Sequence, residues 1–331
     1  ITEGPHKDTQ DLQVPAFRWF NRFFKDDQGT VDKVAVKLLE PKQLRVFDQL
    51  PADQINTTIQ ETFGPTAAPP AVPHSAREWE TLRDSLLTQL KRKTFAGWPD
   101  SPPPLDLRES ATTSGNDARL RTFTFTSQPG AELNLYVAMP ATGPIDELKL
   151  NIIDEAGWAA FASTREKQEA ARSGTALAWF APRGIGPTAW NPDPKKQTQI
   201  RRRFALIGQT LDGMRVWDVR RAVQALHSMH SLEKVPVTVA AENQMAGVAL
   251  YAALFEPGIG QLDLAALPRT HRNGPHLLNV LQTLDLPMTV AMVAERSSVR
   301  LRHATESDWN YPAAVAKQLG WPANRLQFVP E

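Results

Sequence analysis

The 331-residue chain contains no cysteine. Without thiol groups it can form no disulfide, no thiolate nucleophile and no zinc–thiolate site. A chain free of cysteine suits an oxidising compartment, so we expect a periplasmic or secreted protein, with a cytoplasmic protein as the alternative.

The sequence also lacks long apolar runs and any excess of charge. No apolar segment approaches the roughly 20 residues needed to cross a bilayer, and no signal peptide is visible. The net charge of +1 gives no long-range attraction to nucleic acid or to an anionic membrane. The basic run at 201–203, close to Lys195 and Lys196, is interpreted as a solvated helix start rather than a phosphate contact. We therefore expect neither nucleic acid nor membrane as a partner.

The residues that are present divide into three regions, 1–40, 41–110 and 111–331. Hydrophobic content of 41% and charged content of 22% are near globular averages. The first region predicts a helix at about 12–25, whose apolar positions recur at helical spacing. These positions are Ala16, Phe17, Phe20, Phe23 and Phe24. The second region is rich in proline, but Ser75 and Glu78 form a capping-box signature before an apolar stripe, which predicts one helix within a partly ordered connector.

The third region alternates strand and helix patterns. Residues 121–127 and 133–139, joined by a turn at 128–130, predict an antiparallel hairpin. Nearly continuous apolar segments then predict buried parallel strands. These segments are 148–153, 175–180, 235–241 and 287–294, with a further strand near 262–267 and a final one at 326–329. Helices are expected at about 210–229, 245–255 and 312–319. Strands that alternate with helices predict a doubly wound, mostly parallel sheet of the α/β class.

Three segments sharpen this prediction. Residues 179–186 contain an Arg-Gly-x-Gly loop after a strand end, and 208–219 form the start of the long helix. The apolar strand at 235–241 leads through a sharp turn into the small-residue helix at 246–253. Together they resemble the α/β-hydrolase superfamily, in particular the acetyl-xylan-esterase-like and prolyl-oligopeptidase-like hydrolases. The resemblance covers 111–331 and implies an α/β-hydrolase fold with an extra N-terminal segment, no metal, no cofactor, and an ester such as an acetylated carbohydrate as ligand.

The nucleophile position departs from the family pattern. The family motif G-x-S-x-G places a serine on a strained turn between strand and helix. Here the corresponding residues are Ala241, Glu242, Asn243, Gln244 and Met245. An amide cannot be activated to attack an acyl carbon, whether Asn243 or, in a register shifted by one, Gln244 occupies the turn. No serine, threonine or cysteine lies between 239 and 247, so the turn is interpreted as degenerate.

The other triad members also depart from the family pattern. The family places the acid after the penultimate strand and the histidine near the end. Glu295 or Asp308 could stand at the acid position, but neither has an identifiable partner, and His303 comes too early for the usual order. Asp154 and Glu155 lie where the family builds part of its oxyanion hole, and their charge would oppose a developing oxyanion.

Four further histidines are weighed individually. His227 and His230 belong to the long helix and are interpreted as packing or surface residues. His271 and His276 lie in a loop after the strand near 262–267. A substrate-facing role for these two is the minority interpretation.

The first residues of the chain resemble the end of such an esterase, with a last strand, a histidine loop and a closing helix. The hypothesis is a tandem architecture, in which residues 1–40 close an upstream hydrolase domain that is absent from this sequence. His6 would be the general base of that domain, and 111–331 would be a second, degenerate copy. The alternative is that His6 is an ordinary terminal histidine.

Three functions remain open. The first is part of a tandem carboxylic-ester hydrolase, whose upstream domain or chain is the partner. The second is a stand-alone pseudo-hydrolase that binds carbohydrate or a protein. The third places a different catalytic group in the cleft. Under the first two hypotheses this chain alone has no esterase activity.

Overall fold

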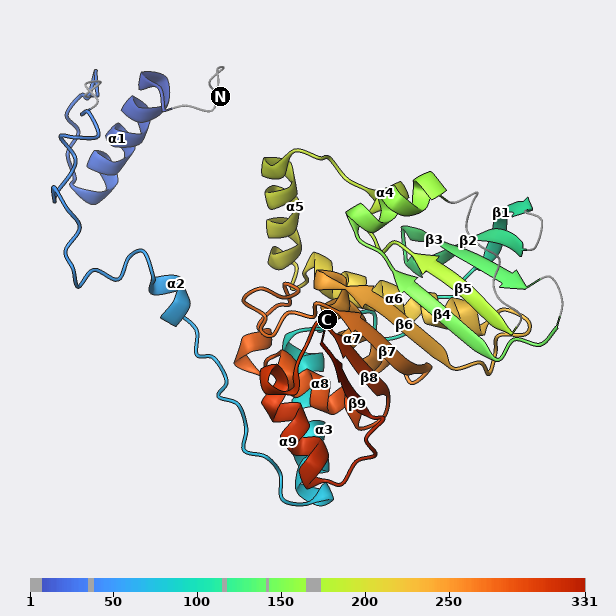
Figure 1. The fold of residues 1–331 in the computed structure, drawn as a ribbon. Helices are drawn as coiled ribbons and strands as arrows, with labels where there is room; N and C mark the ends of the chain where they lie inside the picture. Colours follow the sequence, from blue (N-terminus) through green and yellow to red (C-terminus); the bar gives the residue numbers. More distant parts are fainter. Residues whose placement is uncertain (1–7, 35–38, 115–117, 141–142, 165–173, 331) are drawn as a thin grey trace. The chain divides into compact units, whose positions relative to one another are not determined.

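The computed structural model describes residues 8–34, 39–114, 118–140, 143–164 and 174–330 (Figure 1). The chain divides into two compact units, Ile1–Phe63 and Gly64–Glu331. The described part of the first unit contains the helices α1 (Gln10–Phe24) and α2 (Ile59–Thr62). Helix α1 confirms the helix expected at 12–25. Its aromatic side chains contact one another, yet none of its residues is buried, and Phe24 is 73% exposed.

The second unit is built on one sheet, to which the described residues contribute nine strands in the order β1-β2-β3-β5-β4-β6-β7-β8-β9. The strands are β1 (Arg108–Ser114), β2 (Ala118–Gln128), β3 (Ala131–Pro140), β4 (Glu147–Ile152), β5 (Thr175–Phe180), β6 (Val237–Glu242), β7 (Ile259–Ala265), β8 (Ser298–Arg302) and β9 (Leu326–Val329). Strands β1, β2, β3 and β5 pair antiparallel, whereas β5, β4, β6, β7, β8 and β9 pair parallel. The predicted hairpin and the mostly parallel sheet are both confirmed.

In the described part of the second unit, one helix precedes the sheet in the chain, and the others lie between the parallel strands. They are α3 (Ala76–Lys93), α4 (Glu155–Thr164), α5 (Pro194–Leu206), α6 (Leu211–His227), α7 (Asn243–Phe255), α8 (Leu286–Ala294) and α9 (Asn310–Gln318), with the 3₁₀ turns η2 (Gly186–Thr188), η3 (Val280–Gln282) and η4 (Glu306–Trp309). No helix in the described part of the chain is long and apolar enough to span a bilayer.

The alternation of side chains along β3 shows that both faces of the sheet are covered. Leu135 and Val137 belong to the large core, to which α6, α7 and α8 contribute. Tyr136 and Ala138 point to the other face and pack with Phe161 of α4 in a smaller cluster. The sheet is therefore doubly wound, as the sequence predicted.

The capping signature at Ser75 is present. The backbone N–H of Glu78 donates to the Ser75 hydroxyl at 3.2 Å, and the Glu78 carboxylate accepts from the backbone N–H of His74 at 2.8 Å. Trp79, Leu86 and Leu90 of α3 are buried in the large core. The helical part of the proline-rich region therefore packs within the second unit.

The strand predicted at 287–294 is wrong, because these residues belong to helix α8. Eight of its nine residues are buried, so the segment is apolar on every side and shows no helical periodicity in the sequence. The overlooked signal is at its start, where Asp285 caps the helix and a proline occupies the first turn. The next strand is β8, which buries only Val299 and Leu301 fully.

We predict that Asp285→Ala destabilises the protein by about 2–3 kcal/mol. One carboxylate oxygen of Asp285 accepts from the backbone N–H groups of Leu286 and His271, each at 2.8 Å, and the other accepts from the Thr270 hydroxyl at 2.6 Å. The variant removes a cap and leaves partly buried donors unpaired. Urea unfolding monitored by circular dichroism gives the free energy.

The matched control is Asp193→Ala, which removes the cap of α5, a helix with no buried residue. Its expected cost is at most about 1 kcal/mol. Equal losses in the two variants would contradict the role given to Asp285.

Candidate active-site cleft

The backbone makes a sharp turn where β6 passes into α7. Strand β6 ends at Glu242, helix α7 begins at Asn243, and the φ angle of Asn243 is +52°. Asparagine is one of the few residues besides glycine that tolerates this left-handed conformation. Ala241 and Met245 on either side are buried, whereas Asn243 itself is exposed. The tight strand-to-helix turn predicted at Asn243 is therefore present.

Gln244, the alternative nucleophile position, is held by a neighbouring loop. Its side-chain amide donates to the backbone carbonyl of Asn273 at 2.7 Å. It lies in the first turn of α7, where the backbone is already helical. The left-handed angle therefore singles out Asn243 as the apex of the turn.

A cavity of about 380 Å³ opens beside this turn, at the carboxyl ends of β4, β6 and β8. Its lining residues are Lys149, Asn151, Ile152, Ile153, Asp154, Ala156, Gly157, Ala240, Ala241, Glu242, Asn243 and Arg302. The lining in the described part of the chain includes no serine, threonine, cysteine or histidine. Its polar groups are carboxylates, amides and cations.

The charges around the cavity are balanced. Arg302 donates from Nε to Asp263 at 2.8 Å, and its Nη2 lies 3.5 Å from Glu242. Asp154 accepts from the backbone N–H of Gly157 at 2.7 Å, which fixes its carboxylate at the start of α4. The lining therefore carries Lys149 and Arg302 against Asp154 and Glu242. The lining therefore offers hydrogen-bond donors and acceptors without a net charge.

Neither candidate acid is among the residues that line the cavity, and each is paired with an arginine. Glu295 directly follows α8 and precedes β8, so it lies at the amino end of that strand, and its carboxylate accepts from Arg83 at 2.6 Å. The expectation that Glu295 could stand after the penultimate strand is wrong, because it relied on the incorrect strand at 287–294. Asp308 does follow β8, but it caps the η4 turn and pairs with Arg269 at 2.7 Å. Hydrogen bonds from Thr305 lower the pKa of this exposed carboxyl.

None of the described histidines is among the residues that line the cavity, although His303 directly follows the lining residue Arg302. His303 follows β8 directly, at a φ angle of +57°. His227 is the last residue of α6 and contacts the Val235 carbonyl at 3.0 Å, as expected for a packing residue. His230 is exposed beside Glu233, as expected for a surface residue, but it lies beyond the end of α6 and not on the helix. His276 is exposed, and its backbone N–H donates to Asp212. His6 lies outside the described residues.

His271 belongs to a buried polar chain that the sequence pattern did not indicate. Its Nδ1 lies 3.0 Å from the Pro275 carbonyl, which can only accept, so Nδ1 carries the proton. Nε2 then accepts from the Tyr251 hydroxyl at 2.9 Å, and that hydroxyl accepts from Thr289 at 3.0 Å. Burial lowers the pKa of His271 and raises that of Tyr251. Both ring nitrogens are used and the residue is 9% exposed, so the structure gives no support to a substrate-facing role for His271.

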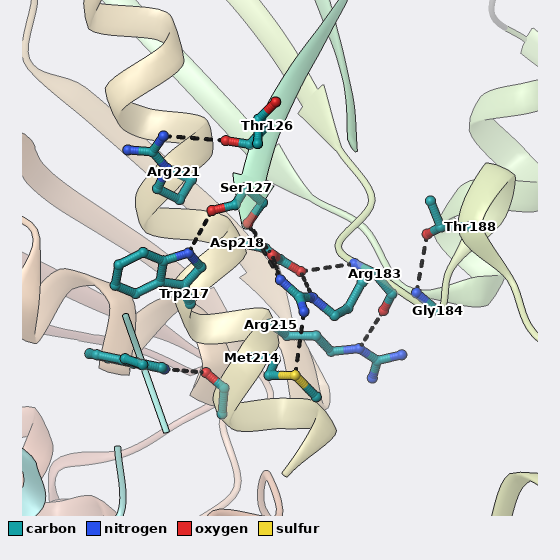
Figure 2. A network of polar contacts seen from close by, with 12 residues as sticks. Thr126, Ser127, Arg183, Gly184, Thr188, Met214, Arg215, Trp217, Asp218 and Arg221 are labelled. Atoms are coloured by element: carbon teal, nitrogen blue, oxygen red, sulfur yellow. Dashed lines mark hydrogen bonds and ion pairs between the residues drawn. The ribbon is translucent and has the colours of Figure 1, made fainter. Parts of the chain in front are cut away.

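The Arg-Gly-x-Gly loop is held by a second buried network (Figure 2). Asp218 of α6 is fully buried, and Arg183 donates to its two carboxylate oxygens at 2.8 and 2.5 Å. The Ser127 hydroxyl, at the end of the hairpin strand β2, donates to the same carboxylate at 2.5 Å. Gly186 has a φ angle of +57°, and an added Cβ would lie 2.6 Å from the Trp158 ring. The loop therefore needs glycine for close packing, and its arginine forms an ion pair with the carboxylate of Asp218 in α6.

No group of three or more acidic or histidine side chains suited to a metal ion occurs among the described residues.

No family model and no curated protein matches this sequence. Solved structures do match in fold. A Bacteroides fragilis protein assigned as an acetyl xylan esterase is 14% identical with a TM-score of 0.65, and the match covers 88% of this chain and 87% of that chain. A glucuronoyl esterase from Solibacter usitatus is 14% identical with a TM-score of 0.54, covering 77% and 86%. A glucuronoyl esterase from Teredinibacter turnerae is 15% identical with a TM-score of 0.51, covering 83% and 86%. The chain has the α/β-hydrolase fold, as the resemblance implied.

We predict that the buried His271 makes stability depend on pH. Its folded-state pKa is lowered from the ordinary value of 6.5, so above pH 6.5 both the folded and unfolded states hold it neutral and its contribution is complete. As the pH falls below this value, the unfolded chain binds a proton that the folded chain does not. Stability should fall by up to about 1.4 kcal/mol per pH unit and level off below the folded pKa.

Urea unfolding between pH 7.5 and 4.5 measures this slope. His271→Gln should flatten it, whereas His230→Gln at an exposed position should leave it unchanged. An unchanged slope in His271→Gln would contradict the prediction.

Proposed function

We propose that the Gly64–Glu331 unit is the non-catalytic, hydrolase-fold module of a carboxylic-ester hydrolase. The observation that carries this proposal is the exposed amide of Asn243 at the left-handed turn between β6 and α7. In the α/β-hydrolase fold a hydroxyl at this turn is the nucleophile. An amide nitrogen or oxygen cannot form the acyl intermediate that such a hydroxyl forms.

The composition of the adjoining cavity supports the same function. Beside Asn243 it presents the carboxylates of Asp154 and Glu242, where an acyl-transfer site requires donors for a developing negative charge. No histidine lines it within the described chain, so a hydroxyl at the turn would also lack a base. The neighbours in fold are named as acetyl xylan and glucuronoyl esterases, which favours an ester hydrolase as the parent activity.

The balanced charge of the cavity favours a neutral polar ligand. Lys149, Asn151 and Arg302 offer donors, and Asp154 and Glu242 offer acceptors. Carbohydrate, including acetylated carbohydrate, has this chemistry. A stand-alone binding module for carbohydrate or for a protein partner is therefore the alternative function.

The tandem hypothesis assigns residues 1–40 to a different hydrolase domain, for which His6 would be the general base. Helix α1 is consistent with it, because Phe17, Phe20 and Phe24 remain between 47% and 73% exposed. An exposed aromatic face of this kind usually marks an interface. A catalytic domain upstream, as another part of the protein or as a separate chain, is the partner under this hypothesis.

We predict that this chain does not hydrolyse aryl acetates above background, and that Asn243→Ser does not restore activity. Serine would supply a hydroxyl, but no histidine lines the described cavity to activate it. Rates of nitrophenyl acetate hydrolysis by wild type, Asn243→Ser and Asn243→Ala should agree within about twofold, far below the ~10⁶-fold gains of working hydrolases.

Two outcomes would overturn the proposal. Turnover by Asn243→Ser that a serine-directed inhibitor abolishes would reveal a general base near the turn. Wild-type turnover that survives both Asn243→Ala and the inhibitor would favour a different catalytic group in the cleft.

The tandem hypothesis makes its own prediction for a protein in which an upstream hydrolase domain accompanies this chain. That protein should hydrolyse aryl acetates, and His6→Gln should lower kcat by about 10³-fold or more, as loss of a triad base does. Asn243→Ala in the same protein should leave kcat unchanged. Full activity in His6→Gln would remove His6 from the catalytic site and leave the binding-module alternative.

A further inference from the structure

A second cavity, of about 390 Å³, lies beside α6, between the end of α3 and the end of α7. Its lining residues are Lys91, Phe95, Ala96, Trp98, Pro99, Asp100, Pro102, Trp217, Arg220, Arg221, Gln224 and Phe255. It shares no lining residue with the cavity at Asn243. Asn243 and Phe255 are opposite ends of the 13-residue helix α7, which places the two sites roughly 20 Å apart. The volume is within the range of small-molecule sites.

One wall of this cavity is aromatic. Phe95 stacks on Trp98 with ring centroids 4.2 Å apart, and Phe255 meets Trp98 edge to face at 5.2 Å. Trp98 is fixed by its indole N–H, which donates to the Gly213 carbonyl at 2.9 Å. Trp98 and Phe255 are only partly buried, so their rings remain accessible from the cavity. A flat apolar group can pack against such a wall.

Arg220 lines the same cavity, and its guanidinium is not fully hydrogen-bonded among the described residues. Its guanidinium carbon lies 5.0 Å from the Trp98 ring centroid and 5.1 Å from that of Trp217, within cation–π range of both indole rings. Its Nε is 3.9 Å from Glu256, too far for a hydrogen bond, and within the described chain this buried atom has no hydrogen-bond partner. Burial lowers the pKa of Arg220. The guanidinium is therefore desolvated without being fully paired.

Arg221 and Lys91 add to the positive charge. Arg221 is 3% exposed and donates to the Pro103 carbonyl and to Gln224, which holds the floor of the cavity in place. Its Nε is a further buried donor that has no acceptor among the described residues. The lining has three cations against the single carboxylate of Asp100, and Glu256 offsets Arg220 only in part. The cavity is net positive.

We propose that this cavity binds a carboxylate carried on an aromatic ring. The carboxylate pairs with Arg220, whose rigid guanidinium edge matches two carboxylate oxygens. The ring packs against Trp98 and Phe255. This site does not depend on the function proposed for the Asn243 cleft, because the two cavities share no residue.

Sodium benzoate is the test ligand, titrated into the full chain and followed by ligand-observed NMR. A dissociation constant on the order of 1 mM is expected for a ligand of this size. Benzamide, which keeps the ring and loses the charge, and acetate, which keeps the charge and loses the ring, should each bind at least about fivefold more weakly.

Arg220→Gln should weaken benzoate binding at least tenfold, in line with the loss of a charged hydrogen bond. Because this substitution also changes packing against two tryptophans, Lys91→Gln at an exposed position is the second variant, with an expected weakening of about two- to fivefold. Arg92→Gln, at the neighbouring exposed position outside the cavity lining, is the matched control and should leave binding unchanged.

Four results would overturn the proposal. The first three are absence of saturable benzoate binding up to 50 mM, about fiftyfold above the expected dissociation constant, equal binding of benzamide and benzoate, and unchanged affinity in a folded Arg220→Gln variant. Inorganic phosphate that binds more tightly than benzoate would also contradict it, since the aromatic wall would then contribute nothing.

Discussion

A buried carboxylate dictates how three separate segments of the second unit meet. Asp218 has no solvent exposure, and an unpaired charge in such a place costs several kcal/mol. Arg183, the backbone N–H of the same residue and Ser127 all donate to it. The end of β2, the loop after β5 and the middle of α6 are therefore held together at one carboxylate, and the arginine of the Arg-Gly-x-Gly loop supplies its counter-charge.

Several elements followed directly from the sequence because local signals and tertiary packing agree. Strands β5 and β9 occupy the residues expected, and α6 begins where Thr210 caps it. The prediction for residues 287–294 failed because a helix that is buried on every side, such as α8, has no amphipathic stripe. Because the sequence predicts a strand at 287–294, Glu295 is expected to follow a strand. The strand in this part of the chain is instead the short, half-polar β8. His303 is the residue that follows β8, and this is known only once the position of β8 in the sheet is known.

Only part of the candidate site could be predicted from the sequence. The turn at Asn243 followed from an apolar strand running into a small-residue helix, and the left-handed angle fits the asparagine that the sequence places there. The polar chain through Tyr251, His271 and Thr289 could not be predicted, because its members are far apart in the sequence and only the packing of α7 against α8 unites them. The cavity beside Arg220 depends in the same way on segments from 91 to 255.

The order of strands has a consequence for the growing polypeptide. Strand β5 lies between β3 and β4, so these two earlier strands have no edge in common and must each wait for residues 175–180. Until then the inner edges of β3 and β4 are unpaired, and unpaired edges are the usual starting points for association between chains. During synthesis on the ribosome, the interval between β4 and β5 is thus a period in which these edges are exposed.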